Sequence, residues 1–103
     1  MFIAKVTGSM VSTQKASTMV GHKLMLVEPF RIDPNDRTRL ATTGRTFVAV
    51  DTMGVGEGEY VLITQGSSAR QTPETKNLPI DTVIVGIIDT VNVEGSQIYN
   101  RDK

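Results

Sequence analysis

Side chains branched at Cβ make up about a third of this chain. Valine, threonine and isoleucine account for 33 of the 103 residues, whereas leucine and alanine contribute only five each. β-Branched side chains lose rotamer freedom in a helix and pack well on the pleated surface of a sheet. The composition therefore predicts a mainly β protein without a clear amphipathic helix.

The length and composition exclude several protein classes. A chain of 103 residues fits a single domain, spanning residues 1–103, with a modest core. Disulfide and thiolate-metal chemistry are excluded because the chain has no cysteine. No apolar run approaches the ~18 residues that a membrane span needs, and the polar residues of the first stretch do not fit a signal peptide. We therefore expect a cytoplasmic protein without membrane contact.

Apolar stretches separated by glycine and proline predict the strands. Phe2, Ala4 and Val6 alternate with Ile3, Lys5 and Thr7, which fits a strand with one face turned inward. Further strands are predicted at 23–28, 46–51, 59–65 and 82–93. Four or five short strands in a chain of this length indicate a small antiparallel barrel or sandwich.

The polar stretch 31–45 is predicted to be a long hairpin excursion. It carries four of the six arginines, and its Asp33-Pro34-Asn35-Asp36 motif is typical of a turn. A calcium-binding loop is excluded because the later glycine and the distal glutamate of such a loop are missing.

The stretch 82–93 is apolar on both faces in its first half. A small barrel has one interior, so Ile84 and Ile88 need cover from a loop, a short helix or a second subunit. Asp89 then interrupts the other apolar row. Either a partner such as Arg70 or a turn of backbone N–H groups compensates a buried Asp89 carboxylate, or a bulge turns it to solvent.

Charge is balanced over the whole chain but not along it. The formal net charge is zero and the isoelectric point is near 6.6, which argues against a protein that binds nucleic-acid phosphates. Residues 1–51 hold seven basic and four acidic side chains, and residues 52–103 hold four basic and seven acidic. Such a dipole would steer unlike surfaces of two copies together, unless both halves mix on one surface.

No pattern of catalytic or ligand-binding residues stands out. The only histidine, His22, lies in a predicted turn without a nucleophile motif nearby, and no metal-ligand spacing is present. The glycine-rich stretch 54–58 precedes a strand rather than a helix, so we interpret it as a tight connection with positive-φ glycines rather than a phosphate loop. We expect no cofactor.

An OB-like module for single-stranded nucleic acid or a small ligand is the alternative function, although the basic groove and aromatic platforms of such modules are lacking.

Short motifs follow one another in a fixed order through most of the chain. They are Ala4-Lys5-Val6-Thr7-Gly8, Val11-Ser12-Thr13-Gln14-Lys15, Leu24-Met25-Leu26-Val27, Val48-Ala49-Val50-Asp51, Gly54-Val55-Gly56-Glu57-Gly58-Glu59-Tyr60-Val61-Leu62, Gly66-Ser67-Ser68-Ala69-Arg70, Pro79-Ile80-Asp81 and Ile84-Val85-Gly86-Ile87-Ile88-Asp89. In this order they resemble the EutN/CcmL family of bacterial microcompartment vertex proteins. The tail, with Asp89-Thr90-Val91-Asn92-Val93 and Ile98-Tyr99-Asn100-Arg101, is most similar to the carboxysome members.

The resemblance implies a fold and a structural role. The expected fold is an OB-like, five-stranded antiparallel β-barrel with one or two short helical turns. The expected function is a homopentamer that caps the fivefold vertices of a microcompartment shell, favouring the carboxysome, and that gives the shell curvature and closure. Its expected partners are hexameric shell proteins, and neither catalysis nor nucleic-acid binding is implied.

The resemblance also implies where the subunits meet. In the family the Gly-Ser-rich segment lies near the fivefold axis, so Ser67 and Ser68 are expected to line a narrow central opening. Arg70 is expected to pair with Asp81 or Asp89, within or across subunits, or else to lie on the surface. The full set of pore and interface candidates is Gly66, Ser67, Ser68, Ala69, Arg70, Asp81, Ile84, Ile88 and Asp89.

Overall fold

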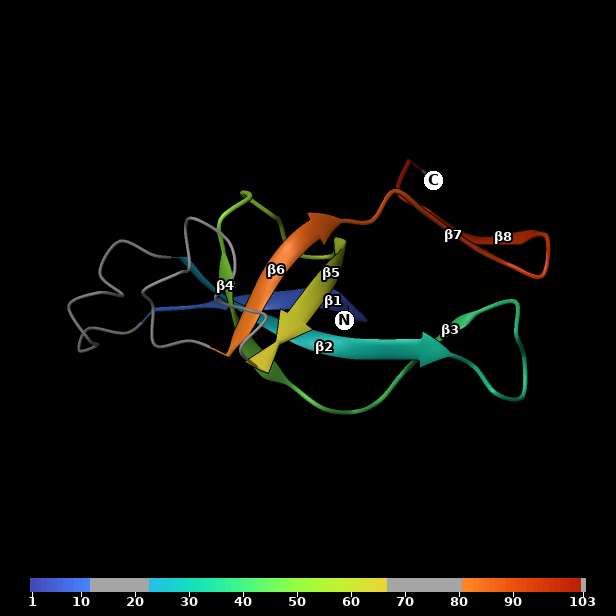
Figure 1. The fold of residues 1–103 in the computed structure, drawn as a ribbon, viewed down its shortest axis with the longest axis horizontal. Helices are drawn as coiled ribbons and strands as arrows, with labels where there is room; N and C mark the ends of the chain where they lie inside the picture. Colours follow the sequence, from blue (N-terminus) through green and yellow to red (C-terminus); the bar gives the residue numbers. More distant parts are fainter. Residues whose placement is uncertain (12–22, 67–80, 103) are drawn as a thin grey trace.

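The computed structural model describes residues 1–11, 23–66 and 81–102, and these residues form eight strands (Figure 1). The strands are β1 (Phe2–Met10), β2 (Lys23–Ile32), β3 (Leu40–Thr42), β4 (Phe47–Asp51), β5 (Tyr60–Gln65), β6 (Thr82–Ile87), β7 (Thr90–Val93) and β8 (Ser96–Asn100). Within these ranges there is no α-helix, and none that is long and apolar enough to cross a membrane. The mainly β prediction is confirmed.

Five strands close into a barrel. The sheet order is β1-β5-β6-β4-β2, and an additional pairing of β1 with β2 joins the two ends. β3 continues the sheet at one end of β2, and β7 and β8 form a separate two-stranded sheet. Closure gives each of the five barrel strands a hydrogen-bonded neighbour on both sides, which is how small β proteins limit edge-to-edge aggregation.

The sequence predicts an antiparallel barrel, but one pair of barrel strands is parallel. β4 and β6 are parallel, with Val50 opposite Val83 and Asp51 opposite Ile84, whereas the other strand pairs are antiparallel. Five strands cannot alternate in direction around a closed ring, because an odd number must leave one neighbouring pair pointing the same way. The closed five-stranded barrel that the family resemblance implies therefore already requires a parallel pair.

The barrel interior is filled by aliphatic side chains. Ala4 and Val6 are fully buried, as the alternation in the first strand predicts, and Val61 and Ile63 face them from β5. Burial of the larger side chains among them, those of Val6, Val61 and Ile63, contributes roughly 1.5–3 kcal/mol each to the stability of the fold. The complete cluster comprises Ala4, Val6, Met25, Val27, Ala49, Val55, Val61, Ile63 and Ile84.

Several strand boundaries differ from the predicted ones. β1 continues past Gly8, because a bulge between Val6 and Gly8 absorbs the irregularity, and β2 continues past Pro29. The predicted strand at 82–93 is interrupted at Ile88 and Asp89, which separate β6 from β7. β3 and β8 were not predicted. The expected helical turns fall near Ser67 and Ser68, outside the described residues.

A second bulge changes the faces of β6. Leu62 lies opposite Gly86 and Ile63 lies opposite Ile84, so one extra residue of β6 stands between these pairs. Ile84 and Ile87 consequently pack toward the same core, rather than on the opposite faces that strict alternation predicts. Ile84 is only 1% exposed, so the chain's own barrel supplies the cover that the sequence analysis sought for it elsewhere.

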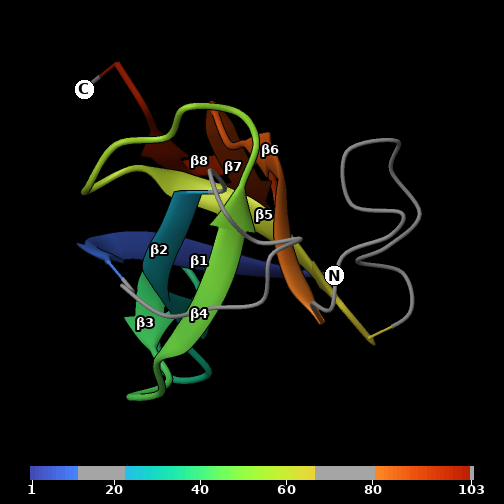
Figure 2. The same ribbon diagram turned by 90° about the vertical axis from the view of Figure 1, so that its left-hand side faces the viewer.

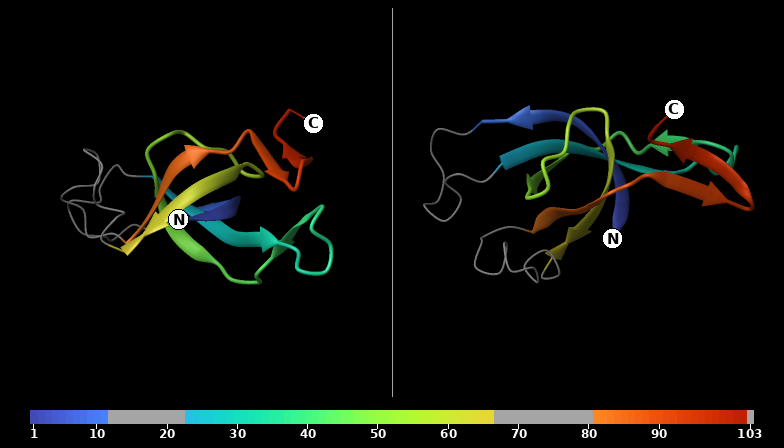
Figure 3. Two further views of the ribbon diagram at one scale, coloured as in Figure 1. Left: turned by 45° about the vertical axis from the view of Figure 1, so that its right-hand side comes forward. Right: turned by 90° about the horizontal axis from the view of Figure 1, so that it is seen from above.

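Two hairpins extend beyond the barrel at one end (Figure 3). One is formed by the end of β2 with β3, and it confirms the predicted excursion at 31–45. The other, formed by β7 and β8, is called the C-terminal hairpin below. With them the molecule measures 45 × 24 × 24 Å.

The loop between β4 and β5 depends on glycine at specific positions. Gly58 has φ of 90° and donates its N–H to the carbonyl of Val6 at 2.7 Å, which ties this positive-φ conformation to the barrel. We expect Gly58→Ala to lower the free energy of unfolding by about 1–2 kcal/mol, because only glycine adopts this φ without strain. Urea denaturation measures the loss.

The neighbouring glycine provides the matched control. Gly56 has no positive φ, and a Cβ there would lie 3.5 Å from the Glu59 Oε1 atom, an ordinary contact. Gly56→Ala should therefore change stability by less than about 0.5 kcal/mol. Equal losses for both variants would show that φ at Gly58 is not the constraint.

Candidate functional site

Two of the predicted interface residues lie together at one end of β6. Gly66, at the end of β5, has φ of 69° and donates its N–H to the carbonyl of Asp81 at 2.8 Å. Both residues are exposed, and both flank the stretch 67–80. Ser67, Ser68, Ala69 and Arg70 lie outside the described residues, so the structure does not test the pore or the ion pairs predicted for Arg70.

Two of the remaining described candidates, Ile88 and Asp89, lie at the opposite end of β6. Ile88 is half-buried, and its N–H donates to the carbonyl of Tyr60 at 2.9 Å. The Asp89 side chain is 80% exposed and its Oδ1 lies 3.7 Å from Arg101 Nη1, so the carboxylate is turned to solvent. The alternative of a buried Asp89 is wrong.

The nine candidates therefore do not form one site within a single chain. β6 is six residues long, which places Asp81 and Ile88 about 20 Å apart. Ile84, between them, points into the core and has no surface to offer a partner. Any contact that uses both ends of β6 must run along the length of the barrel.

A row of apolar side chains on the outside of the barrel accompanies Ile88. Ile3 pairs with Leu62, and Leu62 pairs with Gly86, so the three residues form a line across β1, β5 and β6. They alternate with the core residues Ala4 and Val61 and are half-buried. Gly86 adds no side chain to this row, and a Cβ at this position would lie 3.6 Å from the Cβ atom of Leu62, an ordinary contact.

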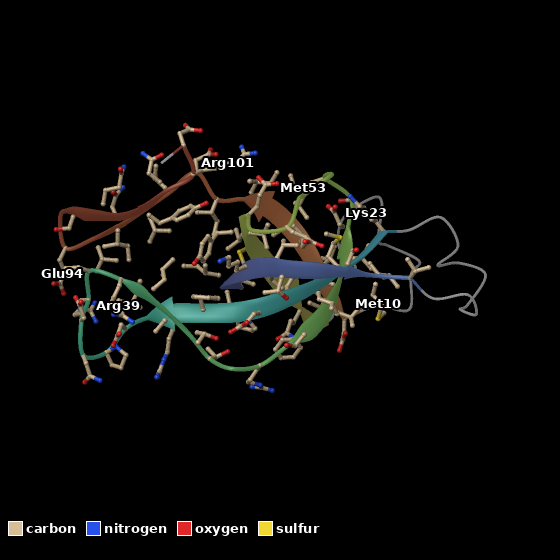
Figure 4. All side chains as sticks on the ribbon, turned by 180° about the vertical axis from the view of Figure 1, so that it is seen from behind. Met10, Lys23, Arg39, Met53, Glu94 and Arg101 are labelled. Carbon is tan, nitrogen blue, oxygen red and sulfur yellow. The ribbon has the colours of Figure 1, made fainter. Side chains whose placement is uncertain are left out.

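The C-terminal hairpin is fixed to the barrel by an ion pair at its base. Arg101 Nη2 lies 2.7 Å from Glu59 Oε2, and the backbone N–H of Arg101 donates to the carbonyl of Asp89 at 2.8 Å. Glu59 in turn accepts the Gly56 N–H through its Oε1 at 2.7 Å. Arg101 is labelled at this base in Figure 4. A two-stranded sheet is marginal alone, so these contacts determine its position.

Aromatic side chains fill the angle between this hairpin and the barrel. The rings of Tyr60 and Tyr99 lie 4.6 Å apart between centroids, and Phe30 meets Tyr60 edge to face at 5.3 Å. Burial raises the pKa of the Tyr60 phenol, with smaller contributions from Tyr99 and Glu28. The phenol therefore stays neutral at physiological pH and acts as a packing group.

Asp51 organises the loop that follows β4. Its carboxylate is fully buried and accepts three backbone N–H groups, while Lys23 Nζ lies 3.9 Å from Oδ2. The donors, at 2.7, 3.1 and 2.9 Å, are Met53, Gly54 and Val55. Asp51 is part of a family motif but is not among the site residues predicted from the sequence, although an aspartate before a glycine-containing turn is the available signal.

The described surface offers little to a small ligand or a metal. The part of the chain covered by the structure contains no group of three or more metal-ligating side chains. An open depression of about 370 Å³ lies beside β8, where its lining residues are Gln97, Ile98, Tyr99 and Asn100. These are consecutive, uncharged residues of one strand, so the depression has no convergent polar groups of the kind that define a ligand site.

The closed barrel, with its outer apolar row and its projecting hairpins, defines an OB-like β-barrel protein with surfaces suited to association. The chain belongs to the EutN/CcmL family: the family model, described as ethanolamine utilisation protein EutN/carboxysome, matches residues 1–89. This family consists of structural shell vertex proteins rather than enzymes, and the family resemblance of the motifs is confirmed.

Individual relatives come from more than one kind of microcompartment. The chain is 44% identical over 92 residues to the shell vertex protein PduN of Salmonella typhimurium, which covers 89% of this chain and 99% of PduN. It is 42% identical over 101 residues to the carboxysome shell vertex protein CcmL of Synechocystis, which covers 98% and 95% of the two chains.

Solved structures agree with the fold. The structure of Gloeobacter violaceus CcmL superposes with a TM-score of 0.86 at 38% identity and covers both chains fully. The pentameric microcompartment shell protein GrpN from Rhodospirillum rubrum superposes with a TM-score of 0.74 at 40% identity, covering 90% of this chain and 98% of GrpN. The relatives of this chain are thus microcompartment shell proteins, among them a pentamer.

Proposed function

We propose that this chain assembles into a homopentamer that occupies the fivefold vertices of a carboxysome shell. The observation that supports this proposal most strongly is the full-length superposition on CcmL of Gloeobacter violaceus, with a TM-score of 0.86. A layer of six-sided tiles is flat, and replacing one tile by a five-sided unit removes a sector and forces curvature. Such a unit acts by shape and by contacts with hexameric neighbours, and it needs no reacting group.

The proposed ring uses the outer apolar row near Ile88 as part of the contact between subunits. Neighbouring subunits of a closed ring meet through two different surfaces of the same chain. The segment that starts at Gly66 and ends at Asp81 is proposed to face the fivefold axis, which places Ser67 and Ser68 at the opening. Gly66 and Asp81 are both exposed at the same end of the barrel, which fits this placement.

A microcompartment with a PduN-type vertex is the second candidate. The 44% identity to PduN favours it, although that match covers 89% of this chain, against 98% for the Synechocystis CcmL match. Both candidates share the pentameric vertex and differ only in the shell into which the pentamer fits.

Complementation of a vertex-deficient shell tests the proposed function. In cells that produce carboxysome shells but lack CcmL, we expect this chain to restore closed polyhedral particles, as seen by electron microscopy. In a parallel experiment, we expect this chain not to restore closed shells in cells that lack PduN. Correction of the PduN-deficient shells alone would select the second candidate, and correction of neither would contradict a vertex function.

A further inference from the structure

The two halves of the sequence occupy two different sides of the barrel. β4, β2 and β1 are consecutive in the sheet order and all derive from residues 1–51, so the first half of the chain forms one continuous wall. β5, β6 and the C-terminal hairpin belong to the second half. Figure 2 shows β3 and β4 on the lower side of the molecule, and the loop before β5 together with β7 and β8 on the upper side.

Opposite charges gather on these sides. In the described part of residues 52–102, six side chains are acidic and one is basic. In the described part of residues 1–51, six are basic and four are acidic. Four of these six basic residues belong to the β2–β3 hairpin and the segment that leads from it into β4: Arg31, Arg37, Arg39 and Arg45.

The two sides already attract each other within one chain. Arg37 Nε lies 2.8 Å from Glu94 Oε1, so the tip of the β2–β3 hairpin contacts the tip of the C-terminal hairpin. Figure 4 shows Arg39 and Glu94 close to this meeting point. Because both members of the Arg37 pair are more than half exposed, this contact itself adds little stability, but it shows that the two surfaces are complementary.

Further charges on each side have no ion-pair partner in the described residues, although the Arg45 guanidinium lies 5.1 Å from the centroid of the Phe47 ring. Arg31 and Arg45 are exposed, and among residues 1–11, 23–66 and 81–102 neither forms an ion pair. The same holds, within those ranges, for Glu57 and Asp102 on the acidic side.

We propose that the basic side of one subunit, through Arg31 and Arg45, docks on the acidic side of the next subunit, through Glu57 and Asp102. This proposal rests on the pentamer proposed above and identifies which surfaces of the chain meet. Unlike surfaces attract, whereas the same surface on two copies repels, so the charges favour head-to-tail association over a face-to-face dimer. The net charge of zero leaves the subunits free of overall repulsion.

Charge reversal on one side at a time tests the docking. One variant carries Arg31→Glu and Arg45→Glu, a second carries Glu57→Arg and Asp102→Arg, and a third combines all four changes. Sedimentation velocity over a range of protein concentrations, at 50 mM and 500 mM NaCl, gives the concentration of half-assembly. Circular dichroism confirms that each variant is folded.

Each one-sided variant should need about tenfold more protein for half-assembly at low salt, and the difference should shrink at high salt. The combined variant should return to within about twofold of the unchanged chain, because both surfaces are reversed together. One-sided variants that assemble like the unchanged chain, or a combined variant that is not rescued, would overturn the docking while leaving the pentamer intact. A monomeric unchanged chain would contradict the pentamer as well.

Discussion

Asp51→Ala is expected to lower the free energy of unfolding by about 3–5 kcal/mol. The carboxylate is fully buried, and it is the acceptor for three backbone N–H groups at 2.7–3.1 Å. Alanine leaves these donors without a partner, and it also removes the carboxylate that faces Lys23. The loop to β5 loses its anchor, and Val55, which packs into the core at 2% exposure, loses its fixed position.

Asp51→Asn is the matched control. The amide keeps the size of the side chain and one acceptor oxygen, but it replaces the other oxygen with a donor that faces N–H groups. We expect a loss between that of the alanine variant and zero, roughly 1–3 kcal/mol. Thermal and urea denaturation of all three proteins measure the series. An alanine variant as stable as the unchanged chain would mean that solvent satisfies the loop N–H groups.

Much of the barrel follows from local patterns. Ala4 and Val6 alternate with Ile3, Lys5 and Thr7 and are fully buried, because every second side chain of a strand points to the same face of the sheet. Glycines at 54 and 58 mark the connection before β5, and both have positive φ as the sequence predicts. These features depend on residues that are close in sequence, so they can be predicted from one amino-acid sequence.

The features that the sequence did not reveal depend on pairing between distant strands. The bulge opposite Leu62 and Ile63 brings Ile84 and Ile87 onto one core, and nothing in the sequence of β6 alone marks it. β8 has only weak strand character by itself. It forms because Val91 pairs with Tyr99, and because Tyr99 packs on Tyr60 of the barrel.

The charge asymmetry is the opposite case, in which a sequence pattern acquires meaning only through topology. Seven basic residues in one half and seven acidic residues in the other do not predict two surfaces, because strands from both halves commonly alternate around a barrel. Here β4, β2 and β1 are neighbours, so the first half forms one continuous part of the barrel wall. The two halves meet where β1 pairs with β5, where β4 pairs with β6, and at the contact of Arg37 with Glu94.

Ile88→Glu is expected to convert the proposed pentamer to monomers at micromolar concentration. Ile88 is half-buried beside an apolar row that includes Leu62, and its backbone N–H binds the carbonyl of Tyr60. Glutamate at this position is hydrated in a free subunit, because the side chain stands at the end of β6. In the proposed contact its charge is desolvated without a partner, at a cost of several kcal/mol for each interface.

Native mass spectrometry distinguishes the two states, with a ring of five expected for the unchanged chain and a single subunit for the variant. Ile88→Val keeps the apolar contact and should stay pentameric. Val11→Glu adds the same charge at a position that is 89% exposed, and it should also stay pentameric.

The Ile88→Glu monomer should retain its fold, with a loss of stability below about 1.5 kcal/mol, since a half-exposed charge keeps most of its hydration. A pentamer that survives Ile88→Glu would exclude this surface from the ring contact, because five unpaired buried carboxylates cannot be accommodated at no cost.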